Sequence, residues 1–312
     1  MALAGCAAPP PTAPHMVYVS DEQANLIHVV DGRTLTETGR IALGKRPRGM
    51  GLSPDGSTLY VAVSNDDRIA AVDLKSRAIR YMGSGPDPER FAVSPDGRTI
   101  YVANEDDGKV SALDIASGKI LRETTVGPEP EGMAVSPDGR WVVCTSEAAS
   151  LVHFIDAATG ELKDSILVGA RPRDAHFTPD GARVWVTSES RASVAIFDVA
   201  SRRIVQTIDL RKAEPPPSVQ AVGLAMTRAA DRIYVGLGRG DHVAEIDART
   251  QKVTRFFQAG SRIWGVALSP DETRLYAAGG LSGDLTVIDL KRGRPIKTLK
   301  LGGRPWGVAV AP

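Results

Sequence analysis

Cysteine is scarce in this chain: only Cys6 and Cys144 carry thiols among 312 residues. Two cysteines exclude a scaffold built on disulfides. Charge of one sign is lacking too, because 38 basic and 37 acidic residues give a net charge of +1. That balance argues against a general attraction to nucleic acid or anionic lipid. No apolar run reaches the roughly 20 residues that a membrane-spanning helix needs. The absences leave a globular domain, whose 42% hydrophobic content can fill a core.

Familiar catalytic motifs are absent as well. The sequence contains no glycine-rich phosphate loop and no serine-nucleophile motif. His28, His153 and His242 fall in three different repeats, so they do not predict a zinc cluster. We therefore expect no cofactor and no metal, and the sequence favours binding over catalysis.

What the chain does contain is a regular repeat. Seven aspartates, each after a short apolar run, are separated by steps of 42, 41, 42, 42, 49 and 42 residues. They are Asp31, Asp73, Asp114, Asp156, Asp198, Asp247 and Asp289. A repeat of this length built only from short strands is typical of a β-propeller. The aspartates themselves are best interpreted as turn residues that accept backbone hydrogen bonds.

One repeat shows how the pattern predicts a blade. Residues 91–93, 100–103, 110–113 and 120–126 form four expected strands, with a Ser-Pro-Asp-Gly turn at 94–97. Proline presets φ and glycine accepts a positive φ, so this tetrapeptide suits a tight turn. The sequence thus predicts an all-β, seven-bladed propeller with four antiparallel strands per blade.

The chain ends predict how the ring closes. The first repeat begins at a second strand, residues 17–19, while the C-terminus stops after a first strand, residues 307–310. We expect the C-terminal segment to supply the inner strand of the first blade, which removes free sheet edges. One propeller domain over residues 16–312 follows, preceded by a tether over residues 1–15.

The repeat also resembles a known family. Tyr101-Val102-Ala103-Asn104, the turn at 94–97 and the strand at 110–114 are similar to the repeat of YVTN-type β-propeller proteins, over roughly residues 16–311. The layout is similar to periplasmic propellers associated with quinoprotein (PQQ-dependent) alcohol catabolism in bacteria. This resemblance implies an exported binding protein whose partner is a periplasmic protein, such as a quinoprotein dehydrogenase or a cytochrome c.

The N-terminus carries a second resemblance. Leu3-Ala4-Gly5-Cys6 resembles the lipobox of bacterial lipoproteins, which implies lipidation of Cys6 and a periplasmic or outer-membrane-anchored location. Only five residues precede Cys6, too few for a signal peptide. Either the start site lies further upstream or the match is accidental. We expect a monomer that reaches the membrane only through such an anchor.

Binding residues are predicted where the repeats differ, in the loops that ring one mouth of the channel. The candidates are Arg46, Arg48, Glu89, Glu131, Arg173, Arg262, Trp264, Arg304 and Trp306. A small planar or anionic ligand could stack on Trp264 and Trp306 while arginines hold its carboxylates. A partner protein could instead recognise the split charge. The third interpretation is that these charges pair with one another and only solvate a rim.

A second difference is the pair Asp174 and His176, two residues apart on one inner strand and so on one side of it. A carboxylate beside an imidazole can act as an acid/base pair, which makes them the candidate catalytic residues. A buried histidine satisfied by its own blade is the alternative. The pair supports a second functional hypothesis, a propeller hydrolase or lactonase that acts on a small carboxylated substrate.

Overall fold

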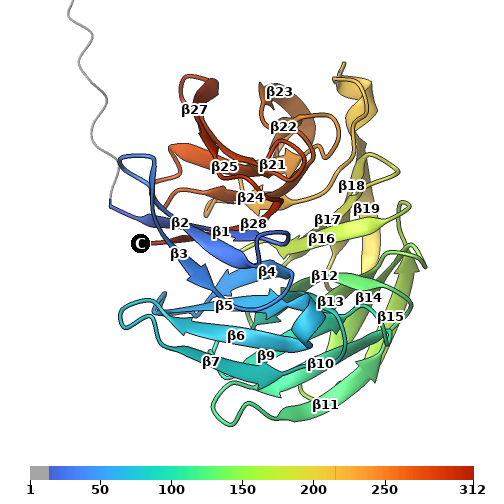
Figure 1. Ribbon diagram of the computed structural model, residues 1–312. Coiled ribbons are helices and arrows are strands. Elements are labelled where there is room, and N and C mark those ends of the chain that lie inside the picture. The colour runs from blue at the N-terminus through green and yellow to red at the C-terminus, as the bar shows by residue number, and fades with distance from the viewer. Residues whose placement is uncertain (1–13, 215) are drawn as a thin grey trace, which may run out of the picture.

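The computed structural model describes residues 14–214 and 216–312. Seven four-stranded antiparallel sheets follow one another around a central axis (Figure 1). In each sheet the strand nearest the axis is followed outward by the next three along the chain, with one exception at the chain ends. The predicted all-β, seven-bladed propeller is confirmed.

We number the sheets as blades 1 to 7 and give their strands from the axis outward. Blade 1 contains β28 (Pro305–Ala311), β1 (Met16–Asp21), β2 (Leu26–Asp31) and β3 (Thr36–Ala42). Blade 2 contains β4 (Pro47–Leu52), β5 (Thr58–Val63), β6 (Arg68–Asp73) and β7 (Ile79–Gly83). Blade 3 contains β8 (Pro88–Val93), β9 (Thr99–Asn104), β10 (Lys109–Asp114) and β11 (Ile120–Thr125). Blade 4 contains β12 (Pro130–Val135), β13 (Trp141–Ser146), β14 (Leu151–Asp156) and β15 (Leu162–Leu167).

The last three blades follow the same order. Blade 5 contains β16 (Pro172–Phe177), β17 (Arg183–Ser188), β18 (Ser193–Asp198) and β19 (Arg203–Asp209). Blade 6 contains β20 (Leu224–Met226), β21 (Arg232–Gly236), β22 (His242–Asp247) and β23 (Lys252–Gln258). Blade 7 contains β24 (Ile263–Leu268), β25 (Arg274–Gly279), β26 (Asp284–Asp289) and β27 (Arg294–Lys300). Two short 3-10 helices, η1 (Ser64–Asp66) and η2 (Leu210–Ala213), lie between strands, and no helix in the described ranges could span a membrane.

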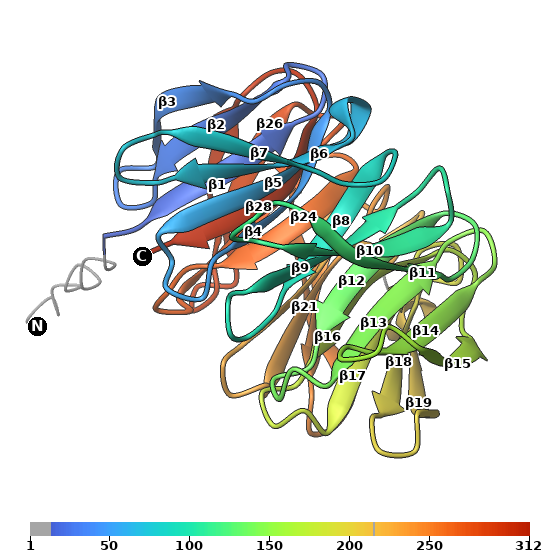
Figure 2. The ribbon, with the colours of Figure 1, turned by 90° about the horizontal axis from the view of Figure 1, so that it is seen from below.

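The ring closes through the C-terminal strand, as the sequence predicts. β28 pairs antiparallel with β1, with Val310 opposite Val17 and Val308 opposite Val19. The red C-terminal strand lies beside the blue N-terminal strand in both views (Figure 1, Figure 2). The innermost position of blade 1 is therefore filled from the far end of the chain.

The periodic aspartates are turn residues. In all seven repeats the aspartate Oδ1 accepts the backbone N–H of the residue three positions later, as Asp31 does from Thr34 at 2.7 Å. Each bond closes the turn between the third and fourth strands of its blade. The aspartate repeat is therefore explained by folding and does not indicate a functional site.

The inner strands approach one another closely along one column of residues. In five blades this column holds glycine, where an added Cβ would lie 2.3–2.8 Å from a backbone oxygen of the next blade. Those glycines are Gly49, Gly132, Gly223, Gly265 and Gly307. Blades 3 and 5 carry Arg90 and Asp174 in the same column. Two charged side chains therefore occupy positions at which the other five blades have no side chain.

The chain entry is tied to blade 7. His15 is 4% exposed, and its Nε2 lies 2.6 Å from the Tyr276 hydroxyl. His15 therefore packs with the propeller, although the sequence places it in the tether. The lipobox-like residues, Cys6 among them, lie outside the described residues.

Candidate functional site

Loops that precede the inner strands form one end of the channel, the mouth face; the Ser-Pro-Asp-Gly turns form the opposite end, the turn face. On the mouth face the rings of Trp264 and Trp306 stack on each other, with centroids 6.1 Å apart at 23°. The Arg262 guanidinium lies 4.1 Å from the Trp264 ring centroid, and that of Arg90 lies 4.6 Å from the centroid of Trp306. Trp306 is 1% exposed. The indole faces are thus covered by protein groups.

A first ion-pair cluster joins blades 1, 2 and 3 at the mouth face. It consists of Glu22, Arg46, Arg48, Asp87 and Glu89. Arg48 contacts Glu89, and its Nε lies 3.0 Å from Glu22 Oε2. Arg46 Nη1 donates to both oxygens of Asp87 at 2.9 Å. Burial alone would lower the pKa of Arg48, but the neighbouring carboxylates, Glu89 above all, raise it above its ordinary value.

A second ion-pair cluster joins blades 4, 5 and 7. It consists of Glu131, Glu147, Arg171, Arg173, Glu189 and Arg262. Arg173 is 7% exposed, contacts Glu131 and Glu147, and donates from Nε to Glu189 at 2.6 Å. Burial opposes ionisation of Glu131, but the Arg173 charge, the hydrogen bond with Glu147 and the charges of Arg90 and Arg48 together outweigh it and hold the pKa of Glu131 below its ordinary value. Glu147 differs, because burial and the adjacent Glu131 carboxylate raise its pKa to about 8.

The predicted mouth residues therefore come together, mostly as partners of one another. The predicted arginines form direct ion pairs with acids of other blades: Arg46 and Arg48 with Glu89, and Arg173 with Glu131, join neighbouring blades, and Arg262 of blade 7 reaches Glu189 of blade 5. Arg304 lies apart from both clusters, and its residue is exposed. Charge pairing across the mouth ties blades together at the channel end.

Glu147 makes stability depend on pH in a way that its amide variant tests. A carboxyl whose pKa is raised on folding gives stability that is complete below its unfolded pKa and is lost as the pH rises toward the folded value. We therefore expect the free energy of unfolding of wild type, measured relative to that of Glu147→Gln, to fall by on the order of 2 kcal/mol between pH 5 and pH 8. Urea unfolding at three pH values measures it; a constant difference would contradict the prediction.

Arg90 crosses the channel below the mouth. It belongs to β8 of blade 3, yet it covers Trp306 of blade 1, and its Nη1 lies 3.4 Å from Asp174 Oδ2 of blade 5. Asp174 Oδ2 also accepts the backbone N–H of Leu224 in blade 6 at 2.9 Å. These contacts join four blades around the axis. The two charges that replace glycine thus form a layer between the mouth and the rest of the channel.

Beyond this layer the channel is hollow. An inner cavity of about 380 Å³ is lined by Arg90, Asp174 and apolar side chains such as Phe91 and Phe177. A turn-face cavity of about 580 Å³ continues toward the Ser-Pro-Asp-Gly turns. Met50 and His176 line both cavities, so the two form one space. The channel is therefore hollow on the turn-face side of the Arg90 layer.

His176 projects into this space from β16. The other blades carry glycine or alanine at its position, and the His176 side chain is 41% exposed. Its Nε2 lies 3.7 Å from Asp174 Oδ1, beyond hydrogen-bond distance. The predicted pair is thus assembled at a cavity wall, with an imidazole that a ligand can reach.

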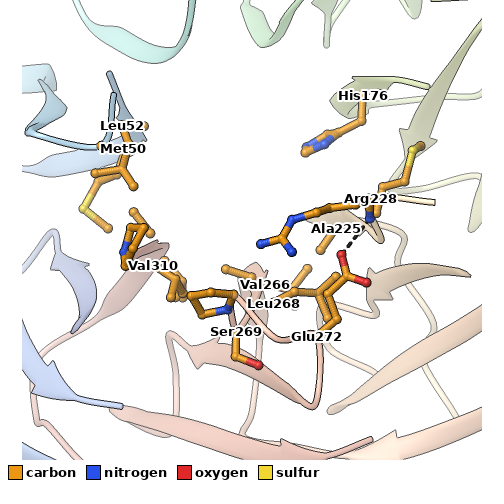
Figure 3. Close-up of a pocket in the computed structure, with 18 of the residues that line it drawn as sticks. Met50, Leu52, His176, Ala225, Arg228, Val266, Leu268, Ser269, Glu272 and Val310 are labelled. Carbon is orange, nitrogen blue, oxygen red and sulfur yellow. Dashed lines mark hydrogen bonds between the residues drawn. The ribbon is translucent and has the colours of Figure 1, made fainter. Parts of the chain in front are cut away.

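Arg228 also faces the turn-face cavity, and the sequence analysis missed it. It occupies the proline position of the turn in blade 6, where it has a backbone N–H that proline lacks. That N–H donates at 2.7 Å to Glu272, which occupies the glycine position of the next blade's turn. The Arg228 side chain points into the cavity (Figure 3), and within the described ranges its guanidinium has no hydrogen bond or ion pair.

Much of the remaining cavity wall is apolar. Met50, Leu52, Val266, Leu268 and Val310 line it, from blades 1, 2 and 7 (Figure 3). Besides Asp174, two carboxylates line this space, and both have donors: Glu272 accepts from Arg228 N–H, and Asp55 accepts from the Ser53 and Ser57 hydroxyls. A cavity with one free guanidinium, one imidazole and apolar walls suits a small ligand with an anionic end and an apolar body.

The fold and this cavity define a seven-bladed propeller with a ligand-sized channel. Residues 89–214 match the family described as cytochrome D1 heme domain. Among curated proteins none matches the chain. Similar solved structures include hydrazine synthase of Kuenenia stuttgartiensis, with 22% identity over 93% of this chain and 99% of that chain, at a TM-score of 0.79. The periplasmic gluconolactonase of Pseudomonas aeruginosa has 20% identity over 96% and 99%, at a TM-score of 0.80.

A third similar structure is a functionally unknown protein of Desulfotomaculum acetoxidans, with 16% identity over 95% of this chain and 98% of that chain, at a TM-score of 0.82. At these identities the likeness shows the fold alone. The family match raises the question of a haem. In the matched stretch His153 is 1% exposed and its Nδ1 lies 2.8 Å from the Ser165 hydroxyl, whereas His176 faces the cavity. The channel thus offers one nitrogen ligand for iron, His176, and one partner for a propionate, Arg228.

Proposed function

We propose that the chain is a binding protein for a small organic carboxylate, held in the channel at the turn face. The observation that carries this proposal is the free Arg228 guanidinium, which points into an apolar-walled cavity together with His176. A guanidinium binds a carboxylate through paired, charge-assisted hydrogen bonds. The apolar body of the ligand would lie against Met50, Leu52 and Val310.

Affinity for a simple carboxylate tests this. Benzoate is the probe and benzamide its uncharged analogue, with dissociation constants measured by ligand-observed NMR. We expect Arg228→Ala to weaken benzoate binding about tenfold or more, because a hydrogen bond to a charged group contributes about 1.5–3 kcal/mol. Benzamide, which lacks the charge, should respond little to the same change.

Arg239→Ala is the matched control, since Arg239 is an exposed arginine outside the cavity lining. It should bind benzoate as wild type does. Equal weakening in Arg228→Ala and Arg239→Ala, or benzoate binding that survives Arg228→Ala unchanged, would reject the cavity as the binding site. Haem belongs to the same chemical class and would add a redox centre. Its binding, with a Soret shift that His176→Ala abolishes, would identify the ligand.

A second candidate function is hydrolysis of a lactone. The 3.7 Å approach of His176 to Asp174 at the cavity wall favours it, because an imidazole oriented by a carboxylate can take a proton from water. The products of such a reaction are carboxylates, which Arg228 would hold. Acid release from gluconolactone, followed in a pH-stat, separates the two functions: a rate that His176→Gln removes supports the hydrolase, and an unchanged background rate supports binding alone.

The wider setting is also a proposal. The YVTN-type repeat resemblance and the lipobox-like start support an exported protein that serves a periplasmic, PQQ-linked oxidation system. A partner such as a quinoprotein dehydrogenase or a cytochrome c would dock on the mouth face, where Arg304 is exposed. Fractionation of cells that express the native gene tests the location, and metabolic labelling with a fatty acid tests Cys6.

A further inference from the structure

The mouth face contains a group of carboxylates that the arginines do not fully neutralise. Asp87, Glu89 and Glu105 each place one oxygen so that the three atoms lie within 4.8 Å of one another. Glu89 lies in β8, Asp87 precedes it, and Glu105 follows β9. Asp87 O accepts the Glu105 N–H at 2.9 Å, so the backbone holds the two loops together. The three carboxylates are thus preorganised by the blade.

Glu89 provides a second observation that points to a cation. Its residue is 1% exposed, and Oε1 takes both arginine contacts, from Arg48 and from Arg46 Nη2 at 3.3 Å. Oε2 is buried, and among the described residues no N–H or hydroxyl donates to it. Burial and the adjacent Glu89 raise the pKa of Glu105 to about 9, so at neutral pH a proton is shared between the two carboxyl groups. A divalent cation that displaces this proton would satisfy the buried oxygen directly.

The charges point the same way. Three carboxyl groups meet two guanidinium groups, those of Arg46 and Arg48, and these contact Asp87 and Glu89 but not Glu105. Blade 4 has the equivalent acids Glu129, Glu131 and Glu147, but there Arg173 pairs with two of them. Within the described ranges, no ion pair involves Glu105 of blade 3.

We propose that Asp87, Glu89 and Glu105 bind one divalent cation of the Ca²⁺ class on the mouth face. Ca²⁺ takes oxygen ligands at about 2.3–2.6 Å, so two ligands on opposite sides of the ion lie up to about 5 Å apart. The observed spacing fits without movement of the backbone. Asp87 is 16% exposed, which leaves an open side for the waters that complete the shell.

Arg46 competes with the ion for this site. It holds both oxygens of Asp87, but with 28% of its side chain exposed it can turn toward solvent. Arg46→Gln should therefore tighten binding, whereas Glu105→Gln should weaken it. If the ion were held only by the general negative charge of the surface, loss of any one carboxylate at the mouth face would weaken binding to the same extent, whether it came from blade 3 or from blade 4.

Calorimetric titration of Ca²⁺ into the full chain tests the proposal. We expect one ion per chain, a dissociation constant at least about tenfold weaker in Glu105→Gln, and wild-type binding in Glu129→Gln, which removes one acid of the equivalent group in blade 4. Glu89→Gln is a second ligand variant, and melting with and without Ca²⁺ shows whether each variant folds. No binding by wild type at millimolar Ca²⁺, or equal loss in Glu105→Gln and Glu129→Gln, would overturn it.

Discussion

Deletion of residues 303–312 should abolish the cooperatively folded propeller. The deletion removes β28, whose Trp306, Ala309 and Ala311 are buried and whose backbone pairs with β1 along the inner edge of blade 1. The lost apolar burial and strand pairing amount to about 10 kcal/mol or more. That is comparable with the whole stability of a domain, about 5–15 kcal/mol. Circular dichroism during thermal unfolding measures the result.

The matched control for this deletion removes residues 1–13, which leaves every described strand in place. It should melt close to the full chain. A cooperative transition at the wild-type temperature after loss of residues 303–312 would contradict closure by β28. Addition of a peptide with the sequence of residues 303–312 should restore part of the transition, because the peptide can pair with β1 in place of the deleted β28.

Arg173→Gln should be the most damaging single substitution at the mouth face. Arg173 is 7% exposed and serves three carboxylates, Glu131, Glu147 and Glu189. Its removal leaves Glu131 and Glu189 charged and buried without this partner, a loss that typically costs about 3–5 kcal/mol. We expect a fall in Tm on the order of 10 °C, measured by scanning calorimetry.

Arg211→Gln provides the comparison, because Arg211 also pairs with a carboxylate, Asp209, but keeps a side-chain exposure of 51%. Exposed ion pairs contribute about 0–1 kcal/mol, so its Tm should barely change. Equal Tm values for the two variants would contradict the claim that the buried ion pairs of Arg173 stabilise the propeller. Restoration of the Arg173→Gln loss by a second change, Glu131→Gln, would support the charge argument.

The fold could be predicted from the sequence because each of its rules is local. The aspartate spacing follows from a turn that every blade repeats, and the start of the first repeat at a second strand, residues 17–19, predicts closure by the C-terminus. The four strands expected within residues 91–126 agree with β8 to β11 to within a few residues. Such patterns can be recognised in the sequence because the residues that form each turn and strand pair are close together in the chain, within one blade.

The site could be predicted only in part. Asp174 and His176 were recognisable, since they depart from a column of small residues on one strand. Arg90 replaces glycine in the same column as Asp174, and Arg228 replaces proline in its turn, so both carried a signal that the sequence analysis overlooked. Which charges would pair across the ring could not be predicted, because contacts such as Arg90 with Trp306 and Asp174 depend on the width of the channel.

A crystal of the protein soaked with 4-bromobenzoate tests the central claim most directly, since the anomalous signal of bromine locates the ligand without bias. The account predicts a peak in the turn-face cavity near Met50, Leu52 and Val310, with the carboxylate on Arg228. A peak over Trp264 on the mouth face, or a cavity that stays empty while benzoate binds in solution, would contradict it.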